Sequence, residues 1–132
     1  MYGYCGRVLH VDLTSHRCHV EEPSEHFYRT YIGGSSFGVY YVLTKMPSGI
    51  DAFDPLNVLV FATSATTGAP ISGASRFNVT AKSPLTGAIG DSQAGGFWGT
   101  ELKYASFDAI VITGRSPEPT YLWICDGQYE FR

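Results

Sequence analysis

Short stretches of alternating apolar and polar residues, each ended by turn-forming residues, constrain the fold of this sequence most strongly. "GRVLHVDL" (residues 6–13) has this alternation, and "RCHVEE" (17–22) repeats it after a turn-like "TSH". Alternation of this kind is typical of strands with one buried face, and the short connection predicts a β-hairpin. In this hairpin His10 and His19 would face each other across the two strands.

Later segments extend the strand pattern to the last residue. Two apolar runs predict buried strands, and an alternating stretch, a glycine-containing stretch and a closing hairpin predict the others. The two apolar runs are residues 57–65 and 107–114. The alternating stretch is 76–83, the glycine-containing stretch is 85–93, and the closing hairpin is 120–132. The closing hairpin should turn at Asp126-Gly127, where a type I′ turn gives both residues positive φ.

Three segments favour helices. Ser24 is placed to cap a helix that carries Phe27, Tyr28 and Tyr31. A second helix over 35–46 would be capped by Ser35 or Ser36, and "GFWGTELKYAS" (96–106) suits a third. The second helix should bury one face, formed by residues three and four apart: Phe37, Tyr40, Tyr41 and Leu43. The fold class is therefore α+β, a β-rich domain with mostly antiparallel strands and hairpins plus about three helices.

Composition excludes several classes of protein. A net charge of −3 over 132 residues argues against a general nucleic-acid binder. No run of 18 apolar residues predicts a membrane span, and no secretory signal precedes the first strand. Three cysteines without close spacing do not predict a disulfide framework or a self-contained metal centre. We expect reduced cysteines and a cytoplasmic location.

The glycine-rich segment 72–104 is the main candidate for ligand binding. Glycines let a backbone approach a bulky ligand because no Cβ intervenes. Gln93, Ala94, Gly95 and Gly96 precede the third predicted helix, where leading N–H groups would favour a phosphate. Arg76, at the start of a predicted strand, offers a planar fork of donors to phosphate or ring acceptors.

Other interpretations of these residues stay open at this point. A glycine-rich segment can equally form bulges and sheet corners with no ligand, and no Gly-x-Gly-x-x-Gly or Walker motif is present. His10 and His19 could bind a metal, although surface histidines of a hairpin are the more common case. Ser64 and Ser83 have no base at a recognisable spacing, so the sequence does not indicate nucleophilic catalysis.

Several motifs together resemble the N-terminal, cofactor-binding domain of the tungsten-containing aldehyde:ferredoxin oxidoreductases. The resemblance begins with "GRVLHVDLT" and continues through "YIGGSSFGVYYVL". It is most specific in "SRFNVTAKSPLTG", "AGGFWGTELKYASFDAIVITG" and the closing hairpin, and it covers nearly the entire chain in order.

The resemblance implies a ligand for the glycine-rich segment. In this family two pterins hold a tungsten atom through their dithiolenes, and a magnesium ion bridges the pterin phosphates. Arg76 occupies the position of an arginine that lies between a pterin and an iron–sulfur cluster. Gln93, Ala94, Gly95 and Gly96 occupy the segment that contacts pterin and phosphate, and the backbone carbonyl of Gln93 would face the magnesium ion.

Two local departures from the family pattern stand near these residues. Gln93 replaces a common asparagine, and "TSATTGAP" replaces a "GPLTG"-like approach, which could alter the loop before Arg76. The second pterin cradle and the cysteines for a [4Fe–4S] cluster are also missing. We therefore expect residues 1–132 to be the N-terminal portion of a tungstopterin-binding domain that is incomplete at its C-terminus.

The resemblance also implies an activity and partners. The complete enzyme would oxidise an aldehyde to a carboxylic acid and pass electrons through the cluster to ferredoxin. The isolated chain would be catalytically silent, and its open last strand would pair with the rest of the enzyme, a second polypeptide or a second copy. The alternatives are a non-catalytic module that binds pterin or phosphate, and a structural or assembly fragment.

Overall fold

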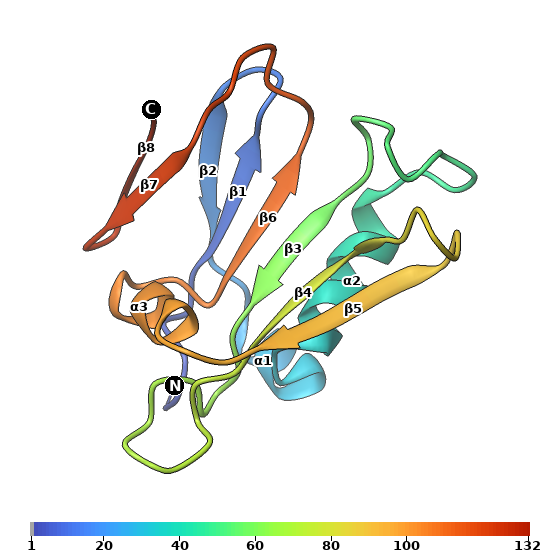
Figure 1. The fold of residues 1–132 in the computed structure, drawn as a ribbon. Coiled ribbons are helices and arrows are strands. Elements are labelled where there is room, and N and C mark those ends of the chain that lie inside the picture. The colour runs from blue at the N-terminus through green and yellow to red at the C-terminus, as the bar shows by residue number, and fades with distance from the viewer. Residues whose placement is uncertain (1) are drawn as a thin grey trace.

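The computed structural model describes residues 2–132 and contains three helices and eight strands within that range (Figure 1). The helices are short. The elements, in chain order, are β1 (Val8–Asp12), β2 (Arg17–Glu21), α1 (Glu25–Tyr31), α2 (Ser35–Lys45), β3 (Leu59–Ala62), β4 (Phe77–Lys82), β5 (Ile89–Ala94), α3 (Trp98–Tyr104), β6 (Ala109–Thr113), β7 (Leu122–Cys125) and β8 (Gln128–Phe131).

Six strands form one sheet in the order β2-β1-β6-β3-β4-β5, and β7 and β8 form a separate hairpin. All neighbours in the large sheet are antiparallel except β1 and β6, which run parallel. This confirms an α+β fold with mostly antiparallel strands. The strand β5 lies at one edge of the sheet, which matters for the site described below.

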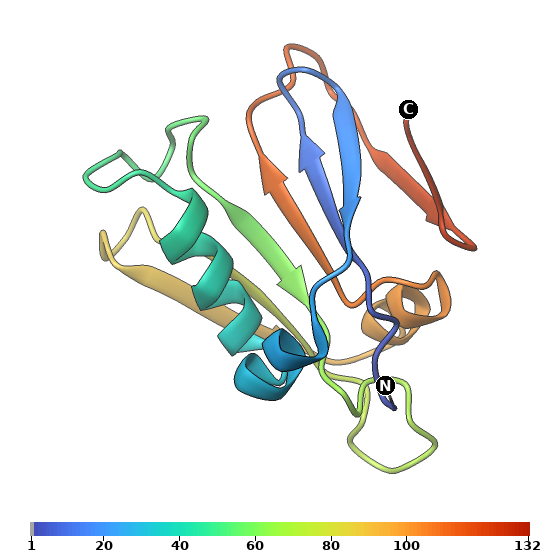
Figure 2. The ribbon, with the colours of Figure 1, turned by 180° about the vertical axis from the view of Figure 1, so that it is seen from behind.

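The two faces of the sheet are covered differently. Helices α1 and α2 lie on one face, whereas α3 and the β7–β8 hairpin lie on the other (Figures 1 and 2). The core under α1 and α2 is rich in buried aromatic side chains, among them Tyr28, Phe37 and Tyr41. The opposite core is centred on Leu9, Phe107 and Ile110, which α3 and the hairpin help to bury.

Both predicted hairpins are present. His10 pairs with His19 in the register of β1 and β2. At the second hairpin Asp126 and Gly127 have φ angles of 48° and 77°, as a type I′ turn requires. The predicted cap of α1 is also confirmed, because the Ser24 hydroxyl accepts a hydrogen bond from the Phe27 backbone N–H.

The structure corrects two expectations for α2. Its N-cap residue is Gly34, not Ser35 or Ser36, and no side chain caps the helix. The Ser35 hydroxyl instead bonds to Asp91, a residue on a distant strand. Leu43 is 65% exposed, so the buried face of the helix is narrower than predicted and is centred on Phe37 and Tyr41.

Two boundaries in the glycine-rich segment also differ from the prediction. Residues 83–88 form a turn closed by Ser83 N–H to Ala88 O, so β5 begins at Ile89. The third helix begins at Trp98, because Gly96 has a φ of 90°, which is incompatible with a right-handed helix.

Candidate functional site

Arg76 and the segment Gln93–Gly96 come together at one end of the large sheet. Arg76 directly precedes β4, and Gln93 and Ala94 are the last two residues of β5. The two strands are paired so that Phe77 lies opposite Ala94. Arg76 is therefore beside the residues that follow Ala94, although 17 positions separate Arg76 from Gln93 in the sequence.

The side chain of Arg76 is exposed. Within residues 2–132 its guanidinium has no hydrogen-bond or ion-pair partner, whereas its backbone carbonyl accepts a hydrogen bond from Thr67. A guanidinium without a protein partner keeps all its donors available for an anionic or ring-nitrogen ligand.

The phase of the β4–β5 ladder decides where the backbone of Gln93 points. Hydrogen-bonded and non-hydrogen-bonded pairs alternate in an antiparallel ladder. The bond from Ser83 N–H to Ala88 O makes that pair hydrogen-bonded. Counting along the register puts Ala94 in a hydrogen-bonded pair and Gln93 in a non-hydrogen-bonded one. The N–H and C=O of Gln93 consequently point away from β4, toward the free edge of the sheet.

Gly95 and Gly96 leave open space beside these groups. A Cβ at Gly96 would have no heavy atom within 4 Å, and its φ of 90° is one that other residues rarely adopt. A Cβ at Gly95 would lie 3.6 Å from the Ser75 hydroxyl, an ordinary contact distance. The backbone of both glycines is therefore accessible to a large ligand.

The structure does not support a role for a helix terminus in this site. The helix α3 has only seven residues, begins two positions after Gly96 and has no side-chain cap. A helix of this length contributes a small dipole. Binding of an anion would thus depend on Arg76 and on the open backbone rather than on α3.

A groove of about 500 Å³ lies next to these residues. The loop 64–76 and the start of α3 form its walls, including Gly73, Ser75, Gly96 and Phe97. Phe97 is 85% exposed at its rim. Ser75 and Gly96 belong both to this groove and to the surroundings of Arg76, so the two features form one continuous surface.

A carboxylate holds β5 against α2 near Gln93. Asp91 accepts hydrogen bonds from the hydroxyls of Ser35 and Thr80, at 2.9 and 2.8 Å, and from the side-chain amide of Asn78. Asn78 and Thr80 are buried on β4. These three donors fix the edge strand two residues before Gln93.

The loop 64–76 is held by hydrogen bonds of its own. The Thr67 hydroxyl accepts from the Ser64 backbone N–H at 2.9 Å and donates to the Arg76 carbonyl at 2.8 Å. The Gly68 N–H donates to the Ala74 carbonyl at 2.8 Å. This loop, below α3 in Figure 1, is thus closed at its base by the bond to the Arg76 carbonyl.

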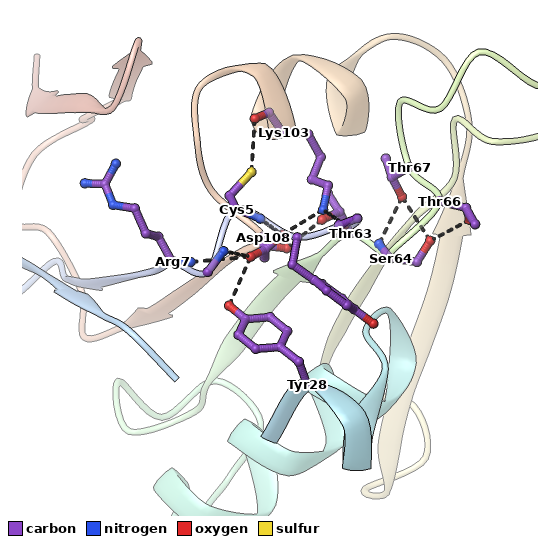
Figure 3. A network of polar contacts seen from close by, with 12 residues as sticks. Cys5, Arg7, Tyr28, Thr63, Ser64, Thr66, Thr67, Lys103 and Asp108 are labelled. Carbon is purple, nitrogen blue, oxygen red and sulfur yellow. Dashed lines mark hydrogen bonds and ion pairs between the residues drawn. The ribbon is translucent and has the colours of Figure 1, made fainter. Parts of the chain in front are cut away.

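A buried carboxylate, Asp108, connects the start of this loop to three other elements (Figure 3). Asp108 has no exposed surface, and its side chain forms an ion pair with Lys103 of α3 at 2.7 Å. It also accepts from the Tyr28 hydroxyl of α1 and from the backbone N–H groups of Cys5 and Gly6.

The backbone of Asp108 completes the connection to the loop. Its carbonyl accepts from both the backbone N–H and the hydroxyl of Thr63, at 2.9 and 2.8 Å. Thr63 directly precedes Ser64, whose N–H bonds to Thr67. A continuous set of polar contacts therefore leads from the ion pair to the backbone of Arg76.

The surroundings of Asp108 change the acidity of its neighbours. Burial, and then the negative charge of Asp108, raise the pKa of the Tyr28 hydroxyl, which stays a donor. The same two causes raise the pKa of the half-buried Cys5 thiol. A thiol with a raised pKa is a poor nucleophile at neutral pH, so the network is suited to holding structure rather than to covalent chemistry.

The histidine pair is not arranged as a metal site. The rings of His10 and His19 stack at 4.6 Å and are nearly parallel, so their nitrogens do not converge. His10 Nε2 bonds instead to Glu21 at 2.6 Å. In the part of the chain that the structure describes, no three His, Cys, Asp or Glu side chains form a metal-binding group. No helix in residues 2–132 is long and apolar enough to cross a bilayer.

Comparisons with known proteins place the chain in a family. Residues 8–132 match the family model described as "Aldehyde ferredoxin oxidoreductase, N-terminal domain". The chain belongs to this family, as the motifs in the sequence predicted.

Two relatives of this chain are named for different enzyme activities. The tungsten-containing aldehyde ferredoxin oxidoreductase of Pyrococcus abyssi is 42% identical over 132 residues, which are all of this chain and 22% of the relative. The aliphatic sulfonate oxidoreductase, WOR-like subunit, of Pyrococcus furiosus is 32% identical over 135 residues, which cover all of this chain and 21% of the relative.

A solved structure confirms the fold. The active site complex BamBC of benzoyl coenzyme A reductase, in complex with 1,5-dienoyl-CoA, matches with a TM-score of 0.95 and 36% identity. The match covers 99% of this chain and 20% of that chain. This chain therefore spans about a fifth of the length of its relatives.

Proposed function

We propose that this chain is the part of a tungsten–pterin oxidoreductase that forms the base of the cofactor site. The observation that carries the proposal is the meeting of Arg76 with Gln93–Gly96 at one end of the sheet, in a chain whose relatives include tungsten-containing enzymes. The complete enzyme would oxidise an aldehyde to a carboxylic acid. When bound, the cofactor supplies the redox chemistry, and the protein positions and tunes it.

The residues present fit a large, anionic, planar ligand. The free guanidinium of Arg76 would donate hydrogen bonds to a pterin ring or to its phosphate. The missing side chains of Gly95 and Gly96 leave room for the ligand to approach the backbone. Ala94 would contribute its small side chain to the same surface.

Gln93 would contribute its backbone rather than its side chain. The ladder phase turns its carbonyl toward the free edge of β5. Carbonyl oxygens are suitable ligands for Mg²⁺, so this group would help to hold a magnesium ion of the cofactor. An Asn-to-Gln exchange leaves the backbone unchanged, and the departure from the family pattern is then without consequence for this contact.

The remaining roles belong to protein beyond this chain. A [4Fe–4S] cluster and a second pterin cradle would come from the rest of the enzyme, and ferredoxin would accept the electrons. Residues 1–132 would thus be the N-terminal portion of a tungstopterin-binding domain. The unpaired edge of β8 would pair with the rest of the enzyme or with a second copy. The three free thiols support a cytoplasmic location.

A second candidate keeps the cofactor and changes the substrate. The relatives are named for aldehydes, aliphatic sulfonates and benzoyl coenzyme A, although all share this domain with 32–42% identity. Because such different enzymes share this domain, its role would be cofactor binding and electron transfer, and other parts of each enzyme would select the substrate. Oxidation of an aldehyde remains the leading assignment because its relatives have the highest identities among the three named here.

The proposal is tested in the complete protein with two variants of the site. Arg76→Ala removes hydrogen bonds to a charged ligand, each worth about 1.5–3 kcal/mol, and should lower the tungsten and pterin content per polypeptide. Gly95→Val puts a branched side chain where the ligand must approach and should do the same. Wild-type cofactor content and turnover in both variants would refute the assignment of this site.

A further inference from the structure

The backbone of Arg76 is fixed, although its side chain is free. Its carbonyl is held by the Thr67 hydroxyl at 2.8 Å, and the next residue, Phe77, is paired in the sheet with Ala94. Backbone atoms on both sides of the Arg76 Cα are therefore constrained. The direction in which the side chain leaves the backbone is set before any ligand arrives.

Thr67 is suited to this role by its position and its chemistry. It is 5% exposed, and its hydroxyl has one proton and two lone pairs. The proton goes to the Arg76 carbonyl, and the oxygen accepts from the Ser64 N–H at 2.9 Å. The Ser64 hydroxyl lies 3.2 Å away as a further partner. All of its hydrogen-bonding capacity is thus directed at the base of one loop.

Thr67 is also packed against α3 on its other side. A Cβ placed on Gly99 of α3 would lie 3.3 Å from the Thr67 methyl group, so the helix packs closely there. Ser64 follows Thr63, which is bonded twice to the carbonyl of buried Asp108 (Figure 3). The Thr67 hydroxyl therefore transfers the rigidity of the Asp108 network to the backbone of Arg76.

We propose that Thr67 is a positioning residue of the cofactor site, which directs the Arg76 guanidinium toward its ligand through the Arg76 carbonyl. The inference rests on the proposed function, because it takes Arg76 as a cofactor contact. A fixed backbone leaves only the side-chain rotations of Arg76 to be ordered when its ligand binds, so the contact is stronger than one from an arginine on a mobile loop.

The test measures how long the complete protein retains its cofactor. The protein and its variants are purified without oxygen and held at a raised temperature, and the released pterin is quantified by fluorescence after oxidation. Thr67→Val keeps the shape of the side chain and removes the hydroxyl. We expect it to shorten the half-life of bound pterin about tenfold, the effect of losing roughly one hydrogen bond. Thr67→Ser keeps the hydroxyl and should retain the wild-type half-life.

Combination with Arg76→Ala separates positioning from general stability. If Thr67 acts through Arg76, the double variant loses pterin no faster than Arg76→Ala alone. If the double variant instead loses pterin faster, by the product of the two single effects, Thr67 acts only on the structure. A wild-type half-life for Thr67→Val, with a shortened half-life for Arg76→Ala, would overturn the inference and leave the proposed function standing. A wild-type half-life for Arg76→Ala would overturn the proposed function itself. Should Thr67→Val not accumulate, Thr67→Cys provides the same comparison with a weaker donor.

Discussion

Replacing Asp108 by asparagine tests the network that supports the candidate site. The substitution changes one oxygen to an NH₂ group and removes the negative charge. Asp108 has no exposed surface, and the side chain of its partner Lys103 is only 9% exposed. Breaking a buried ion pair by removing one charge costs about 3–5 kcal/mol, because the other charge stays buried without a counter-charge; Lys103 would keep its hydrogen bond to the Gly3 carbonyl.

The hydrogen bonds of Asp108 add to this cost. One carboxylate oxygen accepts from the Cys5 N–H and from Lys103, and the other accepts from the Gly6 N–H and the Tyr28 hydroxyl. Whichever way the new amide is oriented, its NH₂ group faces a backbone donor. An unsatisfied buried donor costs about 1–3 kcal/mol. We therefore expect a loss of at least about 3 kcal/mol in the free energy of unfolding.

Urea unfolding followed by circular dichroism measures this loss, and Glu25→Gln is the matched control. The Glu25–Arg29 pair has the same 2.7 Å separation as Asp108–Lys103, but it lies on the exposed face of α1. Its loss should cost only about 0.3–0.5 kcal/mol. Asp108→Asn combined with Lys103→Met should recover part of the stability, since no charge is left buried. Equal effects of Asp108→Asn and Glu25→Gln would refute the reasoning.

Two further predictions concern the sheet and the first hairpin. Gly38→Ala should destabilise the protein, although alanine favours helices by about 1 kcal/mol, because the new Cβ would lie 2.1 Å from the Thr80 hydroxyl oxygen; a higher urea midpoint than wild type would contradict this. Burial lowers the pKa of His10, against the opposing effect of its hydrogen bond to the Glu21 carboxylate. The unfolded chain therefore binds the proton more readily, and stability should fall as the pH drops below about 6.5. Between pH 7.5 and 5.5 the urea midpoint should fall less in His10→Gln than in the wild-type protein. An equal fall in both proteins would contradict the assignment of this pH dependence to His10.

Local patterns were sufficient to predict most elements of the fold. The first hairpin follows from alternation, the start of α1 from Ser24, and the second hairpin from Asp126-Gly127. Each of these depends on residues within a few positions of one another. Arg76 and Gln93–Gly96 were chosen from residue type alone, and their assignment to the cofactor site stays a prediction.

Contacts between distant residues account for what the sequence did not predict. Ser35 does not cap α2 because its hydroxyl bonds to Asp91, 56 positions away. Asp108 lies within a predicted apolar strand, and its partners Cys5 and Gly6 are more than 100 positions away. The sequence did show a charged residue inside an apolar run. Such a residue indicates that a polar partner is buried beside it, but the sequence does not identify that partner.

The role of Thr67 was equally hidden. Its loop was noted only as a departure from the family pattern, and the three-dimensional structure was needed to show that its hydroxyl bonds to the Arg76 carbonyl. The register of β4 and β5 decides that the Gln93 carbonyl points to the free edge. The direction of the Gln93 carbonyl does not depend on residue type, and the hydroxyl of Thr67 does not by itself indicate its partner, the Arg76 carbonyl. Neither result is therefore visible in the sequence.

A crystal structure of the complete protein from its native source, with data collected at a tungsten absorption edge, tests the central claim most directly. The account predicts an anomalous peak at the end of the sheet where β4 begins and β5 ends, with a pterin against Arg76 and Gln93–Gly96. A tungsten peak in another part of the protein, with Arg76 and Gly95 facing only protein or solvent, would contradict it.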